Sequence, residues 1–341
     1  MISRFAYYRE MLIKIPSLPA IPKFINYLKF RSLPRRATMK VKRYTPQIGS
    51  IWVTLRCNLS CGHCAASKIL QTQEQDWRAS EVDLVKLKRI MDHPLYHDCL
   101  LVDLEGGEPL LVNDLDRSVA YLRQNGHLIN TTTNGVLLLQ RIQDLKDAGI
   151  SRISVSCYEE NRTLLERDLE KINAVFPVHA SMILFKSQVL RNPQRLLETA
   201  RFIKDAGCLS LRFWMYRPMG VDPKPEEIIA DDDQAFIEFR RRMEAALPGF
   251  CLWPRPLQTP PMKKRCPQLW QRINCDGLGN MGICCGSDTN LQGPNSNLFS
   301  AGPDVVFNHP TLVKMRTQLL DPKSEPPQLC KTCNLLGDPG W

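Results

Sequence analysis

Three cysteines stand within eight residues in CNLSCGHC, residues 57–64, and they are the strongest chemical signal in the chain. Cys57, Cys61 and Cys64 follow a short apolar run, SIWVTL, which is typical of a buried strand. Three thiolates are one ligand short of a closed zinc site. They are also one short of a fully ligated 4Fe–4S cluster, which would keep one iron open. The spacing alone leaves both kinds of site open.

A second set of cysteines lies toward the C-terminal end. Cys266 and Cys284 are followed, after a long gap, by Cys330 and Cys333, which have two residues between them. Four thiolates suit one fully ligated 4Fe–4S cluster or one zinc ion. Cys285 directly follows Cys284, and the spacing does not say which of these two thiols would serve as the ligand.

The composition is that of a globular protein in a reducing compartment. The chain has 341 residues, of which 43% are hydrophobic and 13 are cysteines, enough for one large α/β domain and a smaller one. No export signal is visible, and no apolar stretch approaches the roughly 18 residues that span a bilayer. We therefore expect a cytoplasmic protein whose clustered cysteines bind metal in place of forming disulfides.

Positive charge is concentrated near the start of the chain. The formal net charge is +10, and residues 1–45 contain eleven Lys or Arg against one acidic residue, Glu10. Three interpretations of the basic, aromatic segment 1–47 stay open. They are an arm packed on the rest of the protein, peripheral attachment to an anionic membrane surface, and binding of an acidic partner. Because the charge is local and no nucleic-acid-binding motif is visible, no nucleic acid partner is predicted.

Six short runs rich in β-branched residues alternate with segments of helical periodicity. The runs cover residues 50–55, 99–104, 128–133, 151–156, 178–184 and 209–214. Ser80 and Asp83 predict a capping box before Leu84. The alternation predicts parallel βα units, in a barrel or in a doubly wound sheet. In a barrel, the residues that follow the strands gather at one face, where active sites form.

Further motifs stand at the ends of these predicted strands. GGEP (106–109) follows the second strand, TTTNG (131–135) lies at the end of the third, and SVSCYEE (154–160) lies at the end of the fourth. Together with CNLSCGHC, they resemble the radical S-adenosylmethionine (radical SAM) superfamily over about residues 48–220. The resemblance implies an α/β fold with a partial (β/α)6 TIM-like barrel, and an iron–sulfur cluster on the first three cysteines.

The resemblance also assigns roles to single residues. The ligands of the SAM-binding 4Fe–4S cluster would be Cys57, Cys61 and Cys64. The residues near SAM would be Gly106, Gly107 and Glu108 at its methionine amine, with Asn134 and Ser156 at its carboxylate or ribose. Reductive cleavage of SAM would give methionine and a 5′-deoxyadenosyl radical, which removes a hydrogen atom from a substrate carbon. His63 departs from the family pattern, because the residue before the third cysteine is usually aromatic.

The C-terminal cysteines resemble the auxiliary-cluster region that is called SPASM in its full form and twitch when it holds one cluster. GNMGIC (279–284) matches the stretch that leads to the second ligand, and residues 286–329 contain no cysteine, so the one-cluster form is favoured. The ligands of this auxiliary 4Fe–4S cluster would be Cys266, Cys284 or its neighbour Cys285, Cys330 and Cys333. The predicted domains are an N-terminal arm (1–47), a radical SAM barrel (48–220), a connector of one helix and Pro-rich sequence (221–265), and an auxiliary-cluster domain (266–341).

An auxiliary cluster favours a two-electron oxidation of the substrate, by dehydrogenation or crosslinking, since the cluster can take the second electron. One alternative is a redox-neutral epimerase of a peptide or sugar, with a cysteine such as Cys157 as hydrogen donor. Another is a non-catalytic zinc or electron-transfer protein. The enzyme interpretation implies a small-molecule or peptide substrate and an electron donor of the flavodoxin or ferredoxin type.

Overall fold

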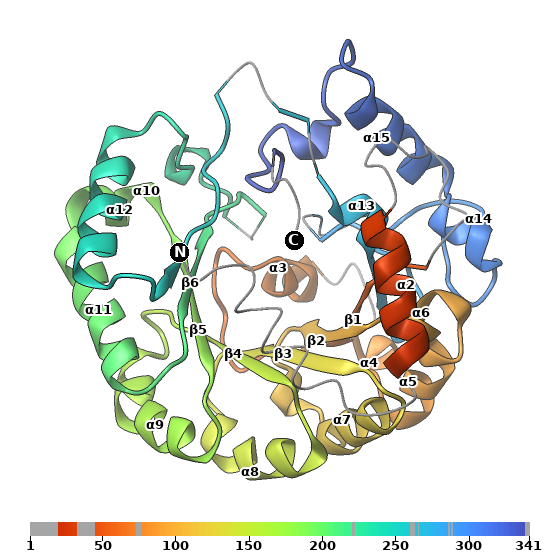
Figure 1. Ribbon diagram of the computed structural model, residues 1–341, viewed down its shortest axis with the longest axis horizontal. Helices are drawn as coiled ribbons and strands as arrows, with labels where there is room; N and C mark the ends of the chain where they lie inside the picture. Colours follow the sequence, from red (N-terminus) through yellow and green to blue (C-terminus); the bar gives the residue numbers. More distant parts are fainter. Residues whose placement is uncertain are drawn as a thin grey trace.

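A parallel β-sheet curved into an open barrel lies at the centre of the computed structural model (Figure 1). The structure describes residues 20–32, 45–72, 77–219, 222–259, 263–264, 266–285, 287 and 289–337. Within these ranges the strand order is β7-β6-β5-β4-β3-β2-β1-β8, and neighbouring strands are parallel. The strands are β1 (Ile48–Thr54), β2 (Leu101–Gly106), β3 (Leu128–Thr133), β4 (Arg152–Ser156), β5 (His179–Leu184), β6 (Leu211–Met215), β7 (Cys251–Leu252) and β8 (Arg272–Asp276).

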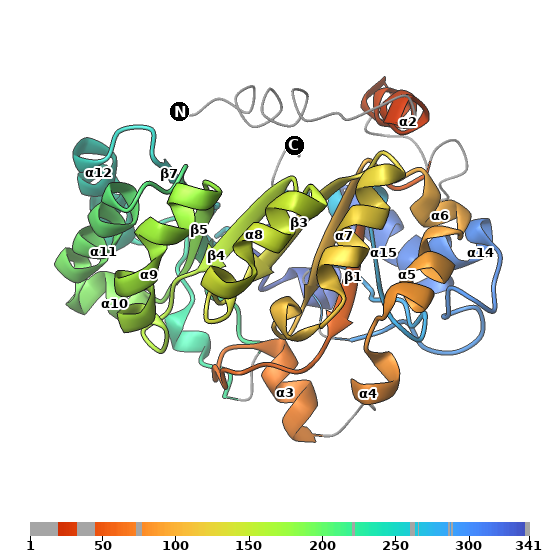
Figure 2. The ribbon, with the colours of Figure 1, turned by 90° about the horizontal axis from the view of Figure 1, so that it is seen from below.

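Helices surround this sheet, and most of them lie on its outer face (Figures 1 and 2). The longer ones are α3 (Ala65–Thr72), α5 (Leu84–Met91), α7 (Leu115–Gln124), α8 (Leu138–Ala148), α9 (Arg162–Val175), α11 (Pro193–Asp205), α12 (Gln234–Ala246), α15 (Pro310–Leu320) and α2 (Ala20–Ser32). Shorter pieces are α4 (Trp77–Ser80), α6 (Pro94–His97), η1 (Pro109–Leu111), α10 (Lys186–Arg191), η2 (Pro225–Glu227), α13 (Gln268–Gln271), α14 (Pro303–Phe307) and η3 (Gln328–Cys330).

The outer face of the sheet is apolar and forms the core under the helices. On β1 and β2, Ile51, Val53, Val102 and Leu104 are at most 2% exposed and belong to this core. Side chains of a strand alternate between the two faces, so the residues between these positions point into the barrel. Burial of the outer face therefore fixes which side chains line the interior.

The inner face carries a polar network between β1, β2, β3 and β8. Arg272 Nη2 lies 2.6 Å from Asp103 Oδ2, and Asn130 Nδ2 donates to Asp103 Oδ1 at 3.0 Å. Ser50 Oγ donates to Glu105 Oε2 at 2.7 Å. Charged groups are stable inside a protein when they are paired in this way. The interior of the barrel therefore offers a polar wall to a ligand.

All six predicted strands are present, with their ends displaced by about two residues or less. The sequence did not predict β7, which has two residues, or β8, which lies in the Gly- and Cys-rich C-terminal part of the chain. Because β8 pairs with β1, residues 272–276 extend the main sheet. The proposed division into four domains stays a prediction.

The predicted capping box was wrong. Ser80 is the last residue of α4, and Asp83 is itself the N-cap of α5, where it accepts from Lys86 N at 2.8 Å. The carbonyl of Ser80 accepts from Gly277 N, just after β8, at 3.0 Å. Ser80 is therefore bonded to a distant segment and does not cap α5. A contact so distant in sequence is not visible in a local pattern.

The helix α2 lies at the end of the sheet opposite α3, the helix that follows the cysteine loop (Figure 2). Asn26 Nδ2 donates to Thr45 Oγ1 at 2.7 Å and to the carbonyl of Asp98 at 3.2 Å, and both partners lie just before strands. None of the described helices is long and apolar enough to cross a membrane.

Candidate functional site

The three-cysteine loop leaves the carboxyl end of β1 and enters α3. Cys61 is buried, while Cys57 and Cys64 are half-buried. Cys57 Sγ accepts from Leu59 N at 3.4 Å and lies 3.8 Å from Asn134 Nδ2. Burial raises the pKa of Cys61 to about 12, and Glu160, Cys64 and Cys57 add to the shift. The three thiols are therefore close enough to one another to interact.

A bidentate ion pair fixes the start of this loop. Arg56, the residue before Cys57, donates from Nε to Glu81 Oε2 at 2.7 Å and from Nη2 to Glu81 Oε1 at 2.9 Å. Thr54 Oγ1 also donates to Glu81 Oε2, at 2.8 Å. Burial would raise the pKa of Glu81, but the bonds from Arg56 and Thr54 outweigh it and lower the pKa. Neither Arg56 nor Glu81 belongs to one of the predicted site motifs.

The two glycines of GGEP pack against the same stretch of backbone. Gly107 N donates to Thr54 O, and Glu108 N donates to Arg56 O, each at 2.7 Å. A Cβ atom would lie 2.2 Å from Thr54 O if added to Gly106, and 2.2 Å from Arg56 O if added to Gly107. Gly106 also has a φ of +134°, which favours glycine. The two glycines thus allow the end of β2 to pack directly against the backbone at the start of the cysteine loop.

Glu108 is fully buried and bonded to protein groups. Its Oε1 accepts from Thr133 Oγ1 at 2.7 Å and from Leu110 N at 3.0 Å, and its Oε2 accepts from Asn134 N at 2.7 Å. Burial raises its pKa in spite of these bonds. Glu108 therefore joins the GGEP turn to the end of β3, and its contact with a methionine amine stays a prediction.

Asn134 and Ser156 are joined by a residue that the sequence analysis missed. Asn161 Nδ2 donates to Asn134 O at 2.6 Å and to Ser156 O at 2.7 Å, while its Oδ1 accepts from Tyr158 N at 2.8 Å. Asn134 Nδ2 in turn donates to Asn58 Oδ1 at 2.7 Å, inside the cysteine loop. Asparagine directly before a helix usually signals a cap, but the amide of Asn161 holds two strand ends instead.

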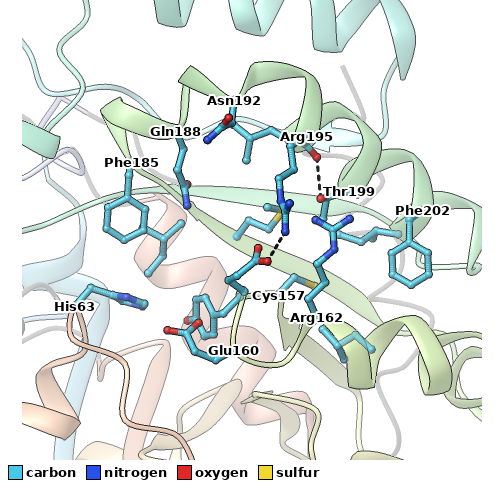
Figure 3. A pocket seen from close by; sticks show the side chains of 17 residues that line it. His63, Cys157, Glu160, Arg162, Phe185, Gln188, Asn192, Arg195, Thr199 and Phe202 are labelled. Carbon is cyan, nitrogen blue, oxygen red and sulfur yellow. Dashed lines mark hydrogen bonds and ion pairs between the residues drawn. The ribbon is translucent and has the colours of Figure 1, made fainter. Parts of the chain in front are cut away.

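A pocket of about 540 Å³ lies beside the cysteine loop (Figure 3). His63, Tyr158 and Phe185 form an aromatic side of it, and the His63 ring centroid lies 5.1 Å from that of Tyr158 and 5.6 Å from that of Phe185. Burial lowers the pKa of His63, which favours the neutral imidazole. Apolar residues extend the pocket between α9 and α11; they include Leu165, Met182, Leu196 and Phe202.

Charged residues of both signs also line this pocket. Arg195 pairs with Glu159, and Arg162 Nε lies 2.7 Å from Glu166 Oε1. Cys157 lines the pocket too, and it belongs with Val155 to the apolar core on the outer face of β4. The alternation of a strand places Ser156 on the other face. Cys157 therefore lies away from the barrel interior.

The C-terminal cysteines come together from three separate segments. Burial raises the pKa of Cys266, and Cys285, Cys333 and Cys330 add to that shift. The pKa values of Cys285 and Cys330 are each raised to about 12, first by desolvation and then by neighbouring thiols, which include Cys284 in both cases. All four predicted auxiliary ligands and Cys285 thus form one neighbourhood, which we call the C-terminal thiol group.

Two arginines face the C-terminal thiol group. The charges of Arg272 and Arg217 both act to lower the pKa of Cys285, whose side chain is exposed, and Arg217 also acts to lower that of Cys330. Desolvation and the neighbouring thiols outweigh them and raise both pKa values. Arg212 lies on β6, and its Cζ atom is 5.3 Å from the ring centroid of Trp214. Cys275 is buried on the outer face of β8, within the apolar core.

The donor chemistry of both groups fits iron–sulfur ligation. Three neighbouring thiols and four or five neighbouring thiols correspond to an open and a fully ligated 4Fe–4S cluster, respectively. Within the described ranges, no three His, Cys, Asp or Glu side chains lie close enough together to bind one metal ion.

Comparison with known proteins gives matches to about half of the chain. Residues 51–208 match the Radical SAM superfamily. A GTP 3′,8-cyclase of Aquifex aeolicus is 33% identical over 187 residues, which cover 50% of this chain and 56% of the relative. A GTP 3′,8-cyclase of Listeria monocytogenes is 28% identical over 186 residues, or 54% of its length. The matched region thus spans about half the length of these relatives.

Solved structures with a similar fold extend over more of the chain. SuiB of Streptococcus suis bound to S-adenosylmethionine superposes with a TM-score of 0.62, at 15% identity, over 85% of this chain and 72% of SuiB. SuiB bound to the precursor peptide SuiA gives a TM-score of 0.60, at 14% identity, over 86% of this chain and 70% of SuiB. At this identity the likeness shows the fold.

Proposed function

Because the chain contains a radical SAM domain, we propose that its three-cysteine loop holds a 4Fe–4S cluster and that the protein reductively cleaves SAM to abstract a hydrogen atom from a substrate. The observation that carries this proposal is the convergence of four strand ends. Residues after β1, β2, β3 and β4 are tied together within hydrogen-bond distance around Cys57. Such an end-of-strand face is where barrel enzymes place their chemistry.

The bound group supplies the radical, and the protein positions it. Cys57, Cys61 and Cys64 are the proposed ligands. Backbone groups of Gly106 and Gly107 would contact the methionine part of SAM, as the family resemblance implies. Both glycines lie against the backbone at the start of the cysteine loop, which places the turn beside the proposed cluster. Glu108 holds that turn through three hydrogen bonds, so we assign it a positioning role as well as the predicted one.

The aromatic side of the pocket suits the adenosyl part of SAM. His63, Tyr158 and Phe185 offer apolar ring surface beside the third cysteine, and a neutral His63 does not repel a sulfonium cation. Asn134 and Ser156 would then lie near the carboxylate or ribose, fixed by Asn161. Buried apolar walls would also exclude water from the radical.

We further propose an auxiliary 4Fe–4S cluster on the C-terminal thiol group, with Cys266, Cys284 or Cys285, Cys330 and Cys333 as ligands. Arg272 supports the link between this group and the barrel, since it contacts Asp103 on the inner face and influences Cys285. An electron acceptor in that position favours a two-electron oxidation, such as dehydrogenation or crosslinking. Because Cys157 lies on the outer face of β4, we favour this oxidation over an epimerisation in which Cys157 would donate a hydrogen atom to a substrate in the barrel interior.

The partners and location follow from this chemistry. The polar interior of the barrel would take a small molecule or a peptide, and a flavodoxin or ferredoxin would supply the electron. We place the protein in the cytoplasm, where thiols stay reduced, with peripheral attachment to a membrane through its basic N-terminal segment.

The direct test is SAM cleavage by anaerobically reconstituted protein. Wild type reduced with dithionite should release 5′-deoxyadenosine from SAM, and Cys61→Ala should release none. Cys99→Ala, which removes a buried thiol in the core, is the matched control and should retain the activity. Equal cleavage by Cys61→Ala and wild type, or zinc in place of iron in the purified protein, would refute the proposal.

A further inference from the structure

A row of exposed aliphatic side chains lies on α2. Ile21, Ile25 and Leu28 are 51%, 46% and 49% exposed, respectively. Their spacing of four and then three residues places them on one face of the helix. We call these three side chains the aliphatic row.

The opposite face of α2 is attached to the body of the protein. Lys23 and Asn26 are 3% and 7% exposed. Asn26 donates to Thr45 and to Asp98, and its Oδ1 accepts from Thr45 N at 3.1 Å. These polar contacts fix the rotation of the helix about its axis. The aliphatic row therefore points away from the sheet because of how α2 is anchored.

The sequence around α2 is strongly basic. Residues 1–45 contain eleven Lys or Arg and one acidic residue, whereas the remainder of the chain is balanced in charge. Basic residues near a surface are attracted to anionic lipids, and aliphatic side chains on the same segment insert at the boundary between headgroups and acyl chains. The helix α2 itself contains three basic residues and no acidic residue. Aliphatic side chains on one face of a basic helix are typical of helices that lie at the boundary between headgroups and acyl chains.

The position of α2 is compatible with docking on a surface. It lies at the end of the barrel opposite α3 and the three-cysteine loop (Figure 2). A surface that contacts the aliphatic row would leave the candidate site open at the other end.

We propose that the aliphatic row docks this protein reversibly on an anionic lipid bilayer, and that the positive charge of the surrounding sequence adds electrostatic attraction. The aliphatic row would be the surface through which the proposed peripheral membrane attachment occurs. This inference rests on that proposed attachment and on no other part of the proposed function. Docking needs neither SAM nor an electron donor. Lipid binding and SAM cleavage can therefore fail independently of each other.

Sedimentation of the full-length reconstituted protein with large vesicles tests the proposal. Vesicles of phosphatidylcholine with a quarter phosphatidylglycerol should bind the wild type, and pure phosphatidylcholine should bind it at least about tenfold more weakly. Binding should also fall at 0.5 M salt. The triple variant Ile21→Gln/Ile25→Gln/Leu28→Gln should lose about tenfold or more in affinity for the mixed vesicles.

A matched variant distinguishes the aliphatic row from exposed apolar surface in general. Val85, Leu190 and Leu209 are 76%, 54% and 44% exposed on other elements. Val85→Gln/Leu190→Gln/Leu209→Gln should bind mixed vesicles like the wild type. Equal binding by both triple variants would overturn the proposal. So would the absence of vesicle binding by the wild type, or self-association through the row without lipid. A SAM cleavage assay on each variant shows that the fold is intact.

Discussion

The two thiol groups of this protein are built in different ways. Cys57, Cys61 and Cys64 lie in one loop, whose ends are held by Arg56 before it and α3 after it. The C-terminal thiol group instead gathers residues from three segments spread over 266–333. The first group is defined by local spacing, while the second exists only because β8 and the segments after it pack beside the barrel. Local sequence therefore identifies the first group more securely than the second.

The supports of the two groups differ as well. The three-cysteine loop is surrounded by hydrogen bonds from the ends of β2 and β3, through Gly107, Glu108 and Asn134. Around the C-terminal thiol group, the backbone hydrogen bonds of the cysteines are local in sequence, as between Cys333 N and Cys330 O, and the longer-range influences are neighbouring thiols and the charges of Arg217 and Arg272. We expect the first site to be rigid before a cluster binds, and the second to depend more on its cluster for order.

The largest expected effect separates the two groups directly. Cys330→Ser should lower bound iron from about eight to about four atoms per chain and should leave SAM cleavage in place. Cys61→Ser should cause a similar loss of iron and should also abolish 5′-deoxyadenosine formation. Iron and sulfide analysis beside the cleavage assay provides the measurement. Equal loss of SAM cleavage in both variants would contradict the assignment of separate roles.

An intermediate effect is expected at the support of the first group. In the wild type, Thr133 Oγ1 and Asn134 N donate hydrogen bonds to the carboxylate of Glu108. Glu108→Gln would place an amide NH2 group, which is itself a donor, opposite one of these donors. The loss of that buried hydrogen bond should destabilise the fold by about 2–3 kcal/mol. The same change should weaken SAM binding, because the GGEP turn loses its tie to β3. Denaturant unfolding and SAM titration of the reconstituted protein measure the two effects.

Glu159→Gln is the control for that variant. Glu159 is an exposed pocket-lining residue, with its side chain 68% exposed and paired with Arg195. Its loss should change stability little. If Glu108→Gln were as stable as this control, the buried carboxylate would not be the support that its hydrogen bonds indicate.

A smaller and pH-dependent effect is expected at Arg56 and Glu81. The pKa of Glu81 is lowered from 4.5 in the folded protein, so its contribution to stability is present above 4.5 and is lost as the pH falls through the lower folded-state value. Glu81→Gln should therefore lower the melting temperature by about 1–2 °C at pH 7. The difference from wild type should shrink at acidic pH.

Glu238→Gln tests whether this pH dependence belongs to the half-buried setting of the Arg56–Glu81 pair. Glu238 and Arg241 form an ion pair on α12 with side chains 53% and 72% exposed. Removal of this exposed pair should give no measurable change at either pH. A pH-independent loss in Glu81→Gln would show that packing, and not charge, supports the start of the cysteine loop.

The sequence allowed much of the barrel to be predicted, because each strand is a short apolar run bounded by turn signals. Gly149 is the C-cap of α8 and Gly207 follows the C-cap of α11, and their φ values of +89° and +88° show why glycine is a reliable signal of a helix end. The strand β8 was missed since RINCD lies among turn-forming residues and is stabilised by pairing with β1. Such pairing depends on tertiary structure, which a local pattern does not contain.

The same distinction holds within the candidate site. The cysteines, glycines, Glu108, Asn134 and Ser156 were predicted because they stand in short motifs at strand ends. Asn161 and Glu81 were missed because each holds the end of a strand that lies up to 27 residues away in the sequence. Their side chains carry no distinctive spacing, so only the folded geometry shows what they hold.

Low-temperature electron paramagnetic resonance of the dithionite-reduced protein tests the central claim most directly. If the three-cysteine loop holds a cluster with an open iron, addition of SAM should change the signal of wild type and of Cys330→Ser. The same addition should leave Cys61→Ser unchanged. A SAM-dependent change that persists in Cys61→Ser, or that is absent from wild type, would contradict the account.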